Sequence, residues 1–340
     1  MKNIIFLIDA QKGASGGGKV IYQYSSYINS LKNFSSSVAH LKKKKVNKWL
    51  QSLNKRINYK KVTYSGWNVS ELTVKKNHSF TWFSTKVQIK NDLKFDKKKD
   101  FVILPEIFAH FAEDLLIKKR IPYAILALNG YNLFPTNDSK KLNISYNNAQ
   151  FILSISKDIK SCISLAFPKV KNKIYDSIYS VDSEKFNLKI KKENLITFMP
   201  RKLPNHSALV TSFLKNSLPK NWKIKSIHNL NEKKVFKMLE KSKIFLAFSE
   251  LEGLPVPPLE AALAGNKVIG YTGEGGSEYW KSPIFTEIKT SEIKNFCKVI
   301  LGNLKNNNFL KKTAKQRKKI SQDFSVLNER KHINKFLKLI

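Results

Sequence analysis

Residues 248–280, FSELEGLPVPPLEAALAGNKVIGYTGEGGSEYW, carry the strongest structural signal in the sequence. An apolar strand ends near Ser249, a loop follows, and Pro257-Pro258 stand where a helix can begin, because proline is tolerated in the first turn. A helix that starts at the carboxyl end of a parallel strand presents free N–H groups and the positive end of its dipole. The segment therefore predicts a strand–loop–helix unit that binds an anion such as a diphosphate.

Two carboxylates flank this predicted anion site. Glu252 lies in the loop and Glu260 lies just inside the helix. Carboxylates accept hydrogen bonds from hydroxyl groups, and a sugar or a ribose supplies such groups in pairs. The simpler alternative is that Glu260 only complements the helix dipole and that Glu252 is a solvated loop residue. The pair alone leaves both interpretations open.

The surrounding pattern resembles glycosyltransferase family 4. The resemblance is carried by the Glu-(seven residues)-Glu spacing of Glu252 and Glu260, the run PPLEAALAG at 257–265 and the later GGSEY at 275–279. It implies a retaining GT-B enzyme in which the first Glu contacts the donor sugar and the second contacts the ribose. Pro255 departs from the pattern, because the family usually has Gly there and proline has no N–H for a backbone contact.

A basic pair, Arg201-Lys202, directly follows the strand predicted at 195–200. The resemblance implies that such a pair neutralises the donor diphosphate. Independently of the family, a departing nucleoside diphosphate builds negative charge, which fixed cations can stabilise without a metal. Only five of the 62 basic residues are Arg, so an Arg at this place is informative. The alternative is an ordinary surface pair.

A glycine-rich segment, GASGGGKV at 13–20, follows the first predicted strand. It fits the spacing of a Walker A loop, but Val20 stands where Ser or Thr would bind magnesium, which disfavours nucleotide hydrolysis. A Gly-rich turn at this place resembles what GT-B enzymes present at their cleft, where backbone can approach a phosphate or an acceptor. We therefore predict donor contacts at Gly16, Gly17 and Gly18, with an ordinary tight turn as the alternative.

Two further loops of the first half follow predicted strands. They are LPEIFAH at 104–110 and LNGYN at 128–132. Loops at the carboxyl ends of parallel strands open toward the ligand crevice. Glu106, Asn129 and Tyr131 are therefore predicted contacts on the acceptor side, with ordinary loop polarity as the alternative.

Strands alternate with helices along the chain, which predicts parallel sheets covered on both faces. A polar, turn-rich stretch after Pro168 separates two such series, and 340 residues suit two domains. We predict an α/β GT-B fold: a Rossmann-like acceptor domain at 1–185, a Rossmann-like nucleotide-sugar domain at 186–323 and a C-terminal helix at 324–340 that packs back on the first. The predicted strands are 4–8, 60–65, 80–85, 101–106, 123–128, 151–156, 195–200, 222–227, 244–249 and 267–272.

The formal net charge of +37 comes mostly from Lys. A phosphate- or lipid-facing surface is one interpretation and a solvated Lys-rich surface is the other. Recognition of nucleic-acid bases favours the forked guanidinium group of Arg, and this chain has mostly Lys, so nucleic acid is not an expected partner. Binding to an anionic membrane surface remains a possible interpretation. The two cysteines match no metal spacing, and the short apolar run at 4–8 suits a buried strand rather than a signal segment. We expect a cytoplasmic protein, with peripheral binding at the inner membrane face left open.

Together these features predict a glycosyltransferase of the hexosyltransferase class that is retaining, needs no metal or other cofactor and acts in cell-surface polysaccharide or lipopolysaccharide synthesis. Its expected partners are a nucleotide sugar and a glycan or lipid-linked acceptor. The alternatives are a basic non-catalytic protein that binds nucleic acid or membrane, and a GT-B isomerase or hydrolase of nucleotide sugars. The predicted catalytic residues are Glu252, Arg201 and Lys202, and the predicted donor contacts are Ser249, Gly253, Leu254, Glu260, Gly16, Gly17 and Gly18.

Overall fold

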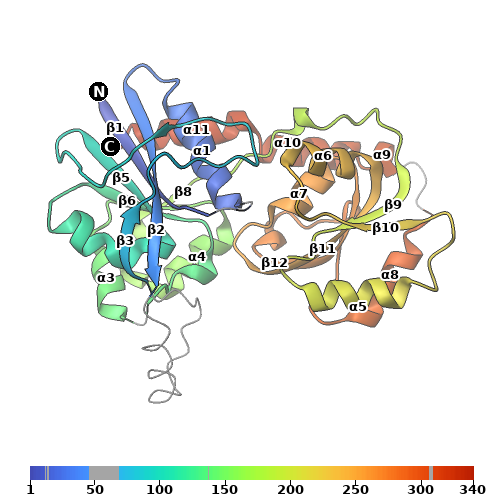
Figure 1. Ribbon diagram of the computed structural model, residues 1–340. Coiled ribbons are helices and arrows are strands. Elements are labelled where there is room, and N and C mark those ends of the chain that lie inside the picture. The colour runs from blue at the N-terminus through green and yellow to red at the C-terminus, as the bar shows by residue number, and fades with distance from the viewer. Residues whose placement is uncertain (12, 14, 46–68, 137, 306–308) are drawn as a thin grey trace, which may run out of the picture. The chain divides into compact units, whose positions relative to one another are not determined.

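The protein divides into two compact α/β units (Figure 1). The computed structural model describes residues 1–11, 13, 15–45, 69–136, 138–305 and 309–340. Unit 1 comprises Met1–Ser177 and His332–Ile340, and unit 2 comprises Ile178–Lys331. The first unit thus ends at Ser177 rather than at residue 185, and the chain returns to it within its last helix.

Unit 1 is built on an eight-stranded sheet with the order β3-β2-β1-β5-β6-β7-β8, in which β4 also pairs with β2. All pairings are parallel except that of β2 with β3. Its central strands read as continuous apolar runs because helices cover both faces. The strands are β1 (Lys2–Asp9), β2 (Phe34–Lys45), β3 (Val69–Val74), β4 (Gln88–Ile89), β5 (Asp100–Pro105), β6 (Tyr123–Ala127), β7 (Phe151–Ser154) and β8 (Ile174–Asp176).

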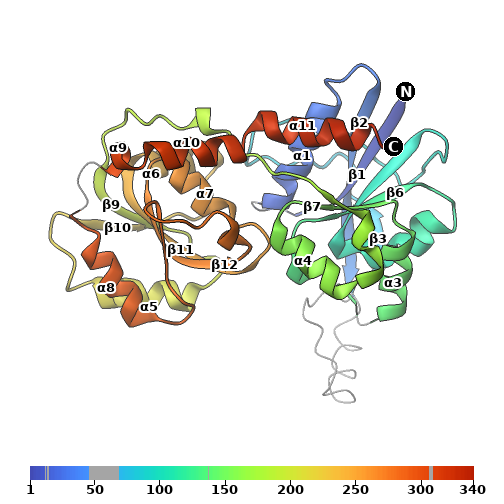
Figure 2. The same ribbon diagram turned by 180° about the vertical axis from the view of Figure 1, so that it is seen from behind.

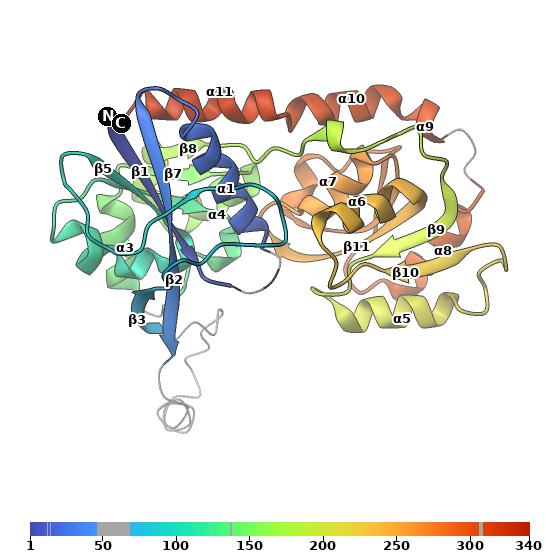
Figure 3. The same ribbon diagram turned by 45° about the horizontal axis from the view of Figure 1, so that its top comes forward.

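Helices α1 (Gly16–Ile28), α3 (Ser139–Asn148) and α4 (Lys157–Ala166) cover this sheet. Figure 3 shows α1 on one face and α3 with α4 on the other. Each helix begins at a residue whose side chain accepts a hydrogen bond from a backbone N–H of the first turn, as stable helix starts require. Short helical turns follow β5 at Glu106–Phe111 and Glu113–Ile117, and β6 at Gly130–Asn132.

The strand expected at 80–85 is wrong. Its apolar alternation is satisfied by ring packing instead: Phe80 and Phe83 contact the Tyr22 ring of α1, with centroids 5.4 and 5.1 Å away. The Phe80 backbone N–H donates to the Tyr22 hydroxyl oxygen at 3.2 Å rather than to a neighbouring strand. The strand expected at 60–65 lies outside the described residues. The strands β2, β3, β4 and β8, and β13 (Phe285–Glu287) of unit 2, were not anticipated.

Unit 2 contains a five-stranded parallel sheet with the order β10-β9-β11-β12-β13. Helices α5 and α8 lie on one face and α6 and α7 on the other (Figure 2). The strands are β9 (Glu193–Phe198), β10 (Lys223–Ser226), β11 (Ser242–Glu252), β12 (Lys267–Glu274) and β13 (Phe285–Glu287). The helices are α5 (Pro204–Leu214), α6 (Glu232–Lys241), α7 (Val256–Leu263), α8 (Ile293–Gly302), α9 (Phe309–Lys312), α10 (Ala314–Asp323) and α11 (Val326–Leu337).

The end of α11 belongs to unit 1. There the buried Phe336 ring packs against three rings of the sheet, with centroids 5.6–6.0 Å away. These rings belong to Phe101, Phe151 and Tyr175. The predicted C-terminal helix therefore completes the core of the first unit.

Each sheet has a point where the strand order reverses. In unit 1, β1 lies between β2 and β5, and in unit 2, β9 lies between β10 and β11. Loops that leave such neighbouring strands in opposite directions open a crevice at the carboxyl ends of the strands. The segments that follow β1, β5, β9 and β11 are therefore where ligand contacts are expected in each unit.

Candidate functional site

An ion pair joins the two loops at the reversal point of unit 2. Lys202 follows β9 and Glu252 ends β11, and the Lys202 Nζ lies 2.9 Å from the Glu252 Oε1. Both side chains are partly exposed, 34% and 18% respectively, so a ligand can reach them. Two predicted catalytic residues that are 50 positions apart along the chain thus meet in space. The third, Arg201, is exposed in the same turn.

The loop after β11 rests on the turn after β12. Glu252 pairs with Glu274, with an irregularity in register after Ser249. Leu251 and Glu274 both have positive φ, 46° and 70°, a conformation that L-residues with large side chains rarely adopt. Such strain persists only where the surrounding structure imposes it, and it is frequent at functional sites. The bulge and the two strained residues therefore mark this corner of the sheet, which sequence reasoning did not anticipate.

Gly275 allows the two turns to touch. A Cβ at Gly275 would lie 2.0 Å from the Gly253 carbonyl oxygen, which is shorter than any real contact of a Cβ. At Gly276 the nearest atom would be 3.4 Å away, in the Pro255 ring. The first glycine is therefore required by the backbone of the Glu252 loop and the second is not.

Tyr279 ties the same loop to the turn. Its side chain is buried, and its hydroxyl group donates to the Pro255 carbonyl oxygen. Burial raises the pKa of Tyr279 well above its ordinary value, and the charges of Glu252 and Glu278 raise it further. The hydroxyl group therefore stays protonated as a donor at physiological pH. The Gly-Gly-x-Glu-Tyr pattern contains this tyrosine, but its hydrogen bond to Pro255 could not be inferred from the pattern.

The start of α7 offers fewer backbone donors than the sequence predicts. Pro255 precedes the helix and Pro257 and Pro258 lie in its first turn, so three of the four N–H groups that normally stay free at a helix start are missing. Val256 supplies the remaining one. The dipole persists, but the expectation of several free N–H groups is wrong, and side-chain cations carry more of the charge complementarity.

The other predicted donor residues of unit 2 surround the ion pair in sequence. Glu260 is 8% exposed within α7, so it is not a solvated residue on the outer face of a helix. A buried carboxylate is costly unless its hydrogen bonds are satisfied. Three other predicted donor residues are buried as well: Ser249, Gly253 and Leu254.

Glu106 connects the segment after β5 to the loop after β6 in unit 1. It follows β5, and its two carboxyl oxygens accept the backbone N–H groups of Leu128 and Asn129 at 3.1 and 3.2 Å. The side chain is only 2% exposed, and burial raises its pKa to about 7 despite these hydrogen bonds, which lower it. The Glu106 carboxyl group therefore holds the loop after β6 in place.

Asn129 and Tyr131 have local partners within the same loop. The Asn129 Oδ1 accepts the Tyr131 N–H at 3.0 Å, and the Tyr131 hydroxyl group donates to the Asp158 Oδ1 at 3.0 Å. These bonds shape the turn that follows β6. The structure thus gives both residues a role in positioning this turn.

The glycine-rich segment begins α1, with Ser15 accepting the Gly18 N–H at 3.1 Å. A Cβ at Gly17 would lie 2.8 Å from the Leu128 side chain, and one at Gly18 would lie 2.7 Å from the Phe80 ring. These two glycines therefore allow close packing rather than a special φ, whereas Gly16 faces open space. Gly17 thereby contacts the loop that Glu106 fixes, so these predicted site residues of unit 1 do converge.

The described residues contain neither a metal-ligand cluster nor a membrane-spanning helix. No three His, Cys, Asp or Glu side chains there are placed to hold a metal ion. No helix there combines the length and the apolar character needed to cross a bilayer.

Comparison with known proteins identifies the fold. No protein-family model and no curated protein matches the sequence. The structure is similar to Anabaena HepE in complex with UDP, with a TM-score of 0.68 at 10% identity over all of both chains. It is similar to a variant of S. aureus TarM in complex with fondaparinux, alpha-GlcNAc-glycerol and UDP, with a TM-score of 0.66 at 12% identity over 100% of this chain and 99% of that one.

A third similar structure is the lipopolysaccharide outer core galactosyltransferase WaaB, with a TM-score of 0.58 at 15% identity over 98% of both chains. At these identities the comparisons establish the fold alone. The chain has the GT-B fold of two Rossmann-like units, as the sequence predicts.

Replacing Gly275 by Ala tests the contact between the two turns of unit 2. We expect a loss of about 1–3 kcal/mol in the free energy of unfolding, because the new Cβ must displace the Gly253 backbone. Gly276→Ala is the matched control, since its Cβ meets no backbone atom in the same way. Urea titration of both variants measures the difference, and equal stability of the two would contradict the close contact.

The raised pKa of Glu106 predicts that the free energy of unfolding falls as pH rises. Its pKa in the folded protein is about 7, above the ordinary 4.5, so the folded state binds one proton more than the unfolded state between these values. Stability from this group is fully present below about pH 4.5 and is lost as pH rises to about 7, by at most about 1.4 kcal/mol per pH unit.

We expect Glu106→Gln to flatten this slope between pH 5 and 7, whatever its effect on absolute stability. Glu184→Gln is the control, because Glu184 is exposed. Buried Glu329, whose pKa is also raised to about 7, contributes a slope of the same sign that remains in both variants. Urea unfolding at several pH values measures the slopes, and an unchanged slope in Glu106→Gln would refute the assignment.

Proposed function

We propose that this GT-B protein is a glycosyltransferase that moves a sugar from a nucleotide-sugar donor to a glycan or lipid-linked acceptor. The observation that carries the proposal is the Lys202–Glu252 ion pair at the reversal point of unit 2. It places a cation and a carboxylate that can accept hydroxyl hydrogen bonds 2.9 Å apart, as a diphosphate linked to a sugar requires. The structural neighbours HepE and TarM, which bind UDP, support this choice of donor class.

In this proposal Lys202 and Arg201 bind the donor diphosphate. The bond between the sugar and the diphosphate breaks, and negative charge accumulates on the leaving phosphate. When the donor binds, the Lys202 ammonium group exchanges its ion pair with Glu252 for one with that phosphate. The exposed guanidinium group of Arg201, the preceding residue, can reach the same phosphate. Fixed cations in a site from which water is excluded lower the energy of such a charged transition state. The three prolines around the start of α7 make these side chains more important, because they remove backbone donors.

Glu252 is then free to accept hydrogen bonds from the sugar hydroxyl groups, while Glu260 binds the ribose. Ser249, Gly253 and Leu254 would shape the donor pocket from the β11 side. In unit 1 we assign Gly16, Gly17 and Gly18 to the approach of the donor. The incoming acceptor hydroxyl group forms the new bond to the sugar carbon and gives its proton to the leaving phosphate, which yields retention without a protein nucleophile.

The acceptor side is assigned to the loops of unit 1 that hold Glu106, Asn129 and Tyr131. Because all three have partners within the fold, we assign them to positioning of the loop edge that meets the acceptor. TarM with alpha-GlcNAc-glycerol and the lipopolysaccharide galactosyltransferase WaaB support an acceptor in cell-surface polysaccharide or lipopolysaccharide synthesis. If the acceptor is lipid-linked, the Lys-rich surface would bind the anionic lipids at the cytoplasmic face of the membrane.

Substitution of the two glutamates separates their roles. Glu252→Gln should lower sugar transfer by about 10- to 150-fold and leave binding of the free nucleoside diphosphate nearly intact, because the transferred sugar is absent from that ligand. Glu260→Gln should lower the affinity for the nucleoside diphosphate itself by a similar factor. Calorimetry with UDP and a transfer assay measure both effects.

A panel of nucleotide sugars tested by thermal shift selects the donor first, because a ligand at about 100 times its Kd adds about 2.7 kcal/mol of stability. If both glutamine variants bind the selected nucleoside diphosphate like the parent, the ribose role of Glu260 is wrong. If no nucleotide sugar binds the parent protein, the proposed activity fails.

Transfer is expected to survive a metal chelator. Lys202 and Arg201 supply the charge that a divalent cation supplies in metal-dependent transferases. The measurement is the initial rate of transfer with and without EDTA. Loss of activity in EDTA, with recovery after addition of Mn²⁺, would contradict this cation assignment.

A further inference from the structure

Helix α5 of unit 2 presents large apolar side chains to solvent as well as to the core. Val210 and Leu214 are buried in the core beneath the helix. On the outer side, Leu209 and Phe213 are 48% and 59% exposed. Because these two residues are four positions apart on one helix, their side chains are neighbours on its surface. The helix therefore carries an exposed apolar pair in addition to the apolar residues that hold it on the sheet.

The setting of this pair is free of charge. Its exposed neighbours on α5 include Asn205, Ala208 and Ser212, and the helix contains no Lys, Arg, Asp or Glu. Charged residues make up 26% of the chain, so a helix of 11 residues is expected to contain about three of them. Single exposed apolar side chains are common, whereas an apolar patch indicates an interaction surface.

Lysines border the apolar pair. Helix α8 lies beside α5 on the same face of the sheet (Figure 2), where the Cys297 Sγ is 3.8 Å from the Val210 carbonyl oxygen. On α8, Lys294 and Lys298 are exposed and four positions apart, so they share one face of that helix. Lys215, directly after α5, is exposed as well. The outer surface of the two helices thus has an apolar centre and a basic border.

No acidic residue occurs within these two helices. The sequence has no Asp or Glu from residue 194 to 231 or from residue 293 to 322, and these ranges include all of α5 and α8. Glu292 lies directly before α8, where its Oε2 accepts an N–H of the Asn295 side chain at 2.9 Å. The surface is therefore positively charged overall, and it complements a negatively charged partner.

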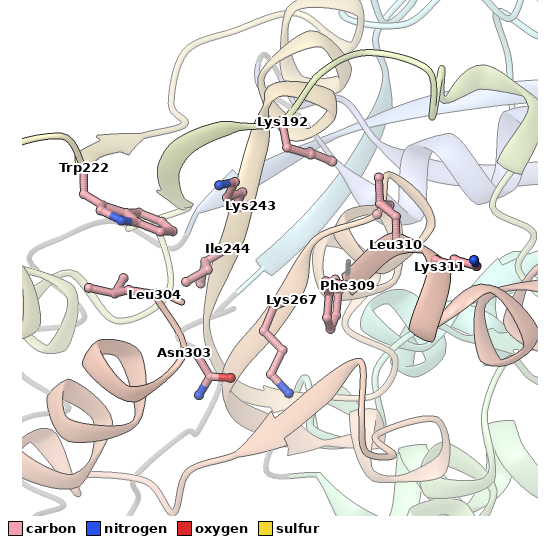
Figure 4. Close-up of a pocket in the computed structure, with 11 residues that line it drawn as sticks. Lys192, Trp222, Lys243, Ile244, Lys267, Asn303, Leu304, Phe309, Leu310 and Lys311 are labelled. Atoms are coloured by element: carbon pink, nitrogen blue, oxygen red, sulfur yellow. The ribbon is translucent and has the colours of Figure 1, made fainter. Parts of the chain in front are cut away.

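Lysine by itself does not distinguish this surface from the rest of unit 2. Lys192, Lys243, Lys267 and Lys311 also line a cavity of about 320 Å³ at the end of the sheet that is opposite to the Lys202–Glu252 pair (Figure 4). A chain with 62 basic residues presents lysines in many places. The surface of α5 and α8 differs because its lysines surround an exposed apolar pair.

A second copy of this chain fits the surface less well than a lipid bilayer. An 11-residue helix is about 16 Å long and about 10 Å wide, so two copies paired along α5 would bury on the order of 300 Å² in total. Stable protein interfaces bury about 1,200–2,000 Å². Pairing would also bring together the lysine borders of two strongly basic chains. An anionic bilayer attracts those lysines and accepts the apolar pair among its acyl chains.

We propose that the outer surface of α5 and α8 binds an anionic membrane, with Leu209 and Phe213 inserted among the lipids and the bordering lysines paired with headgroup phosphates. Helix α5 begins at Pro204, shortly after the Arg201-Lys202 pair, so the contact keeps the proposed donor site of unit 2 near the bilayer that holds a lipid-linked acceptor. This use rests on the proposed transfer reaction, but the binding itself requires neither donor nor acceptor.

Sedimentation of the full chain with lipid vesicles tests this surface. Vesicles of phosphatidylcholine with phosphatidylglycerol present an anionic bilayer, and vesicles of phosphatidylcholine alone are the neutral comparison. We expect partition onto the anionic vesicles to be at least about tenfold stronger, because each lysine near an anionic surface strengthens binding about fivefold. Added salt should weaken this partition, because it screens the charges.

Leu209→Asn and Phe213→Asn should each weaken partition about 3- to 10-fold, because about half of each apolar side chain becomes newly buried in the bilayer. Leu165→Asn is the matched control and should bind like the parent, because Leu165 is an exposed leucine of α4 in unit 1. Phe213→Trp should retain binding, which separates loss of apolar surface from misfolding.

The lysine border has its own pair of variants. Lys298→Gln should weaken partition onto anionic vesicles about fivefold. Lys233→Gln is the matched control and should have a smaller effect, because Lys233 is an exposed lysine of α6, which covers the other face of the sheet.

Three results would overturn the membrane surface. The first is partition onto anionic vesicles that is absent or no stronger than onto neutral ones. The second is an equal loss in Leu165→Asn and Leu209→Asn, which would indicate general adhesion of apolar side chains. The third is a dimer that forms without vesicles and is abolished by Phe213→Asn, which would make a second copy the occupant. None of these measurements uses a nucleotide or sugar transfer, so a failure here is separable from a failure of the proposed activity.

Discussion

The parallel pairing of β11 with both β9 and β12 is the constraint on which the candidate site of unit 2 depends. Because β11 lies between these strands, its carboxyl end meets the loop after β9 on one side and the turn after β12 on the other. The first meeting produces the Lys202–Glu252 ion pair, and the second requires Gly275. The site is therefore a property of strand order, and the loops adapt to it through a bulge and two strained residues.

The same sheet separates two kinds of charged environment. At the carboxyl ends, a cation and a carboxylate form an ion pair, and both side chains remain accessible. At the amino ends, lysines line a cavity whose described lining residues include no carboxylate, and burial lowers the pKa of two of these lysines. Lys192 donates to carbonyl oxygens at the C-terminal ends of α6 and α7, so the helix that carries Glu260 is held at the end of the sheet opposite to the ion pair. The helix that carries the proposed ribose contact is thus held in place at its C-terminal end.

Much of the fold was predictable because buried parallel strands are short, continuous apolar runs. This signal located β1, β5, β6, β7, β9, β11 and β12, whereas β10, which was also predicted, is neither buried nor a continuous apolar run. It failed at 80–85, where apolar residues alternate as in a strand but pack as rings around Tyr22. It also missed β2, whose FSSSVAHLKKKK sequence has too few apolar residues to indicate a central strand. A local sequence pattern indicates that a side chain is buried, but it does not indicate which element that side chain packs against.

The sequence by itself determined the α/β class, the two series of strands and the identity of Glu252, Glu260, Arg201 and Lys202 as candidates, because strand ends and helix starts are local features. Tertiary structure alone decided that Lys202 meets Glu252, that Glu106 holds the loop after β6, and that lysines from three strands share a cavity. These contacts join residues tens of positions apart, and strand order, which no local pattern encodes, brings them together.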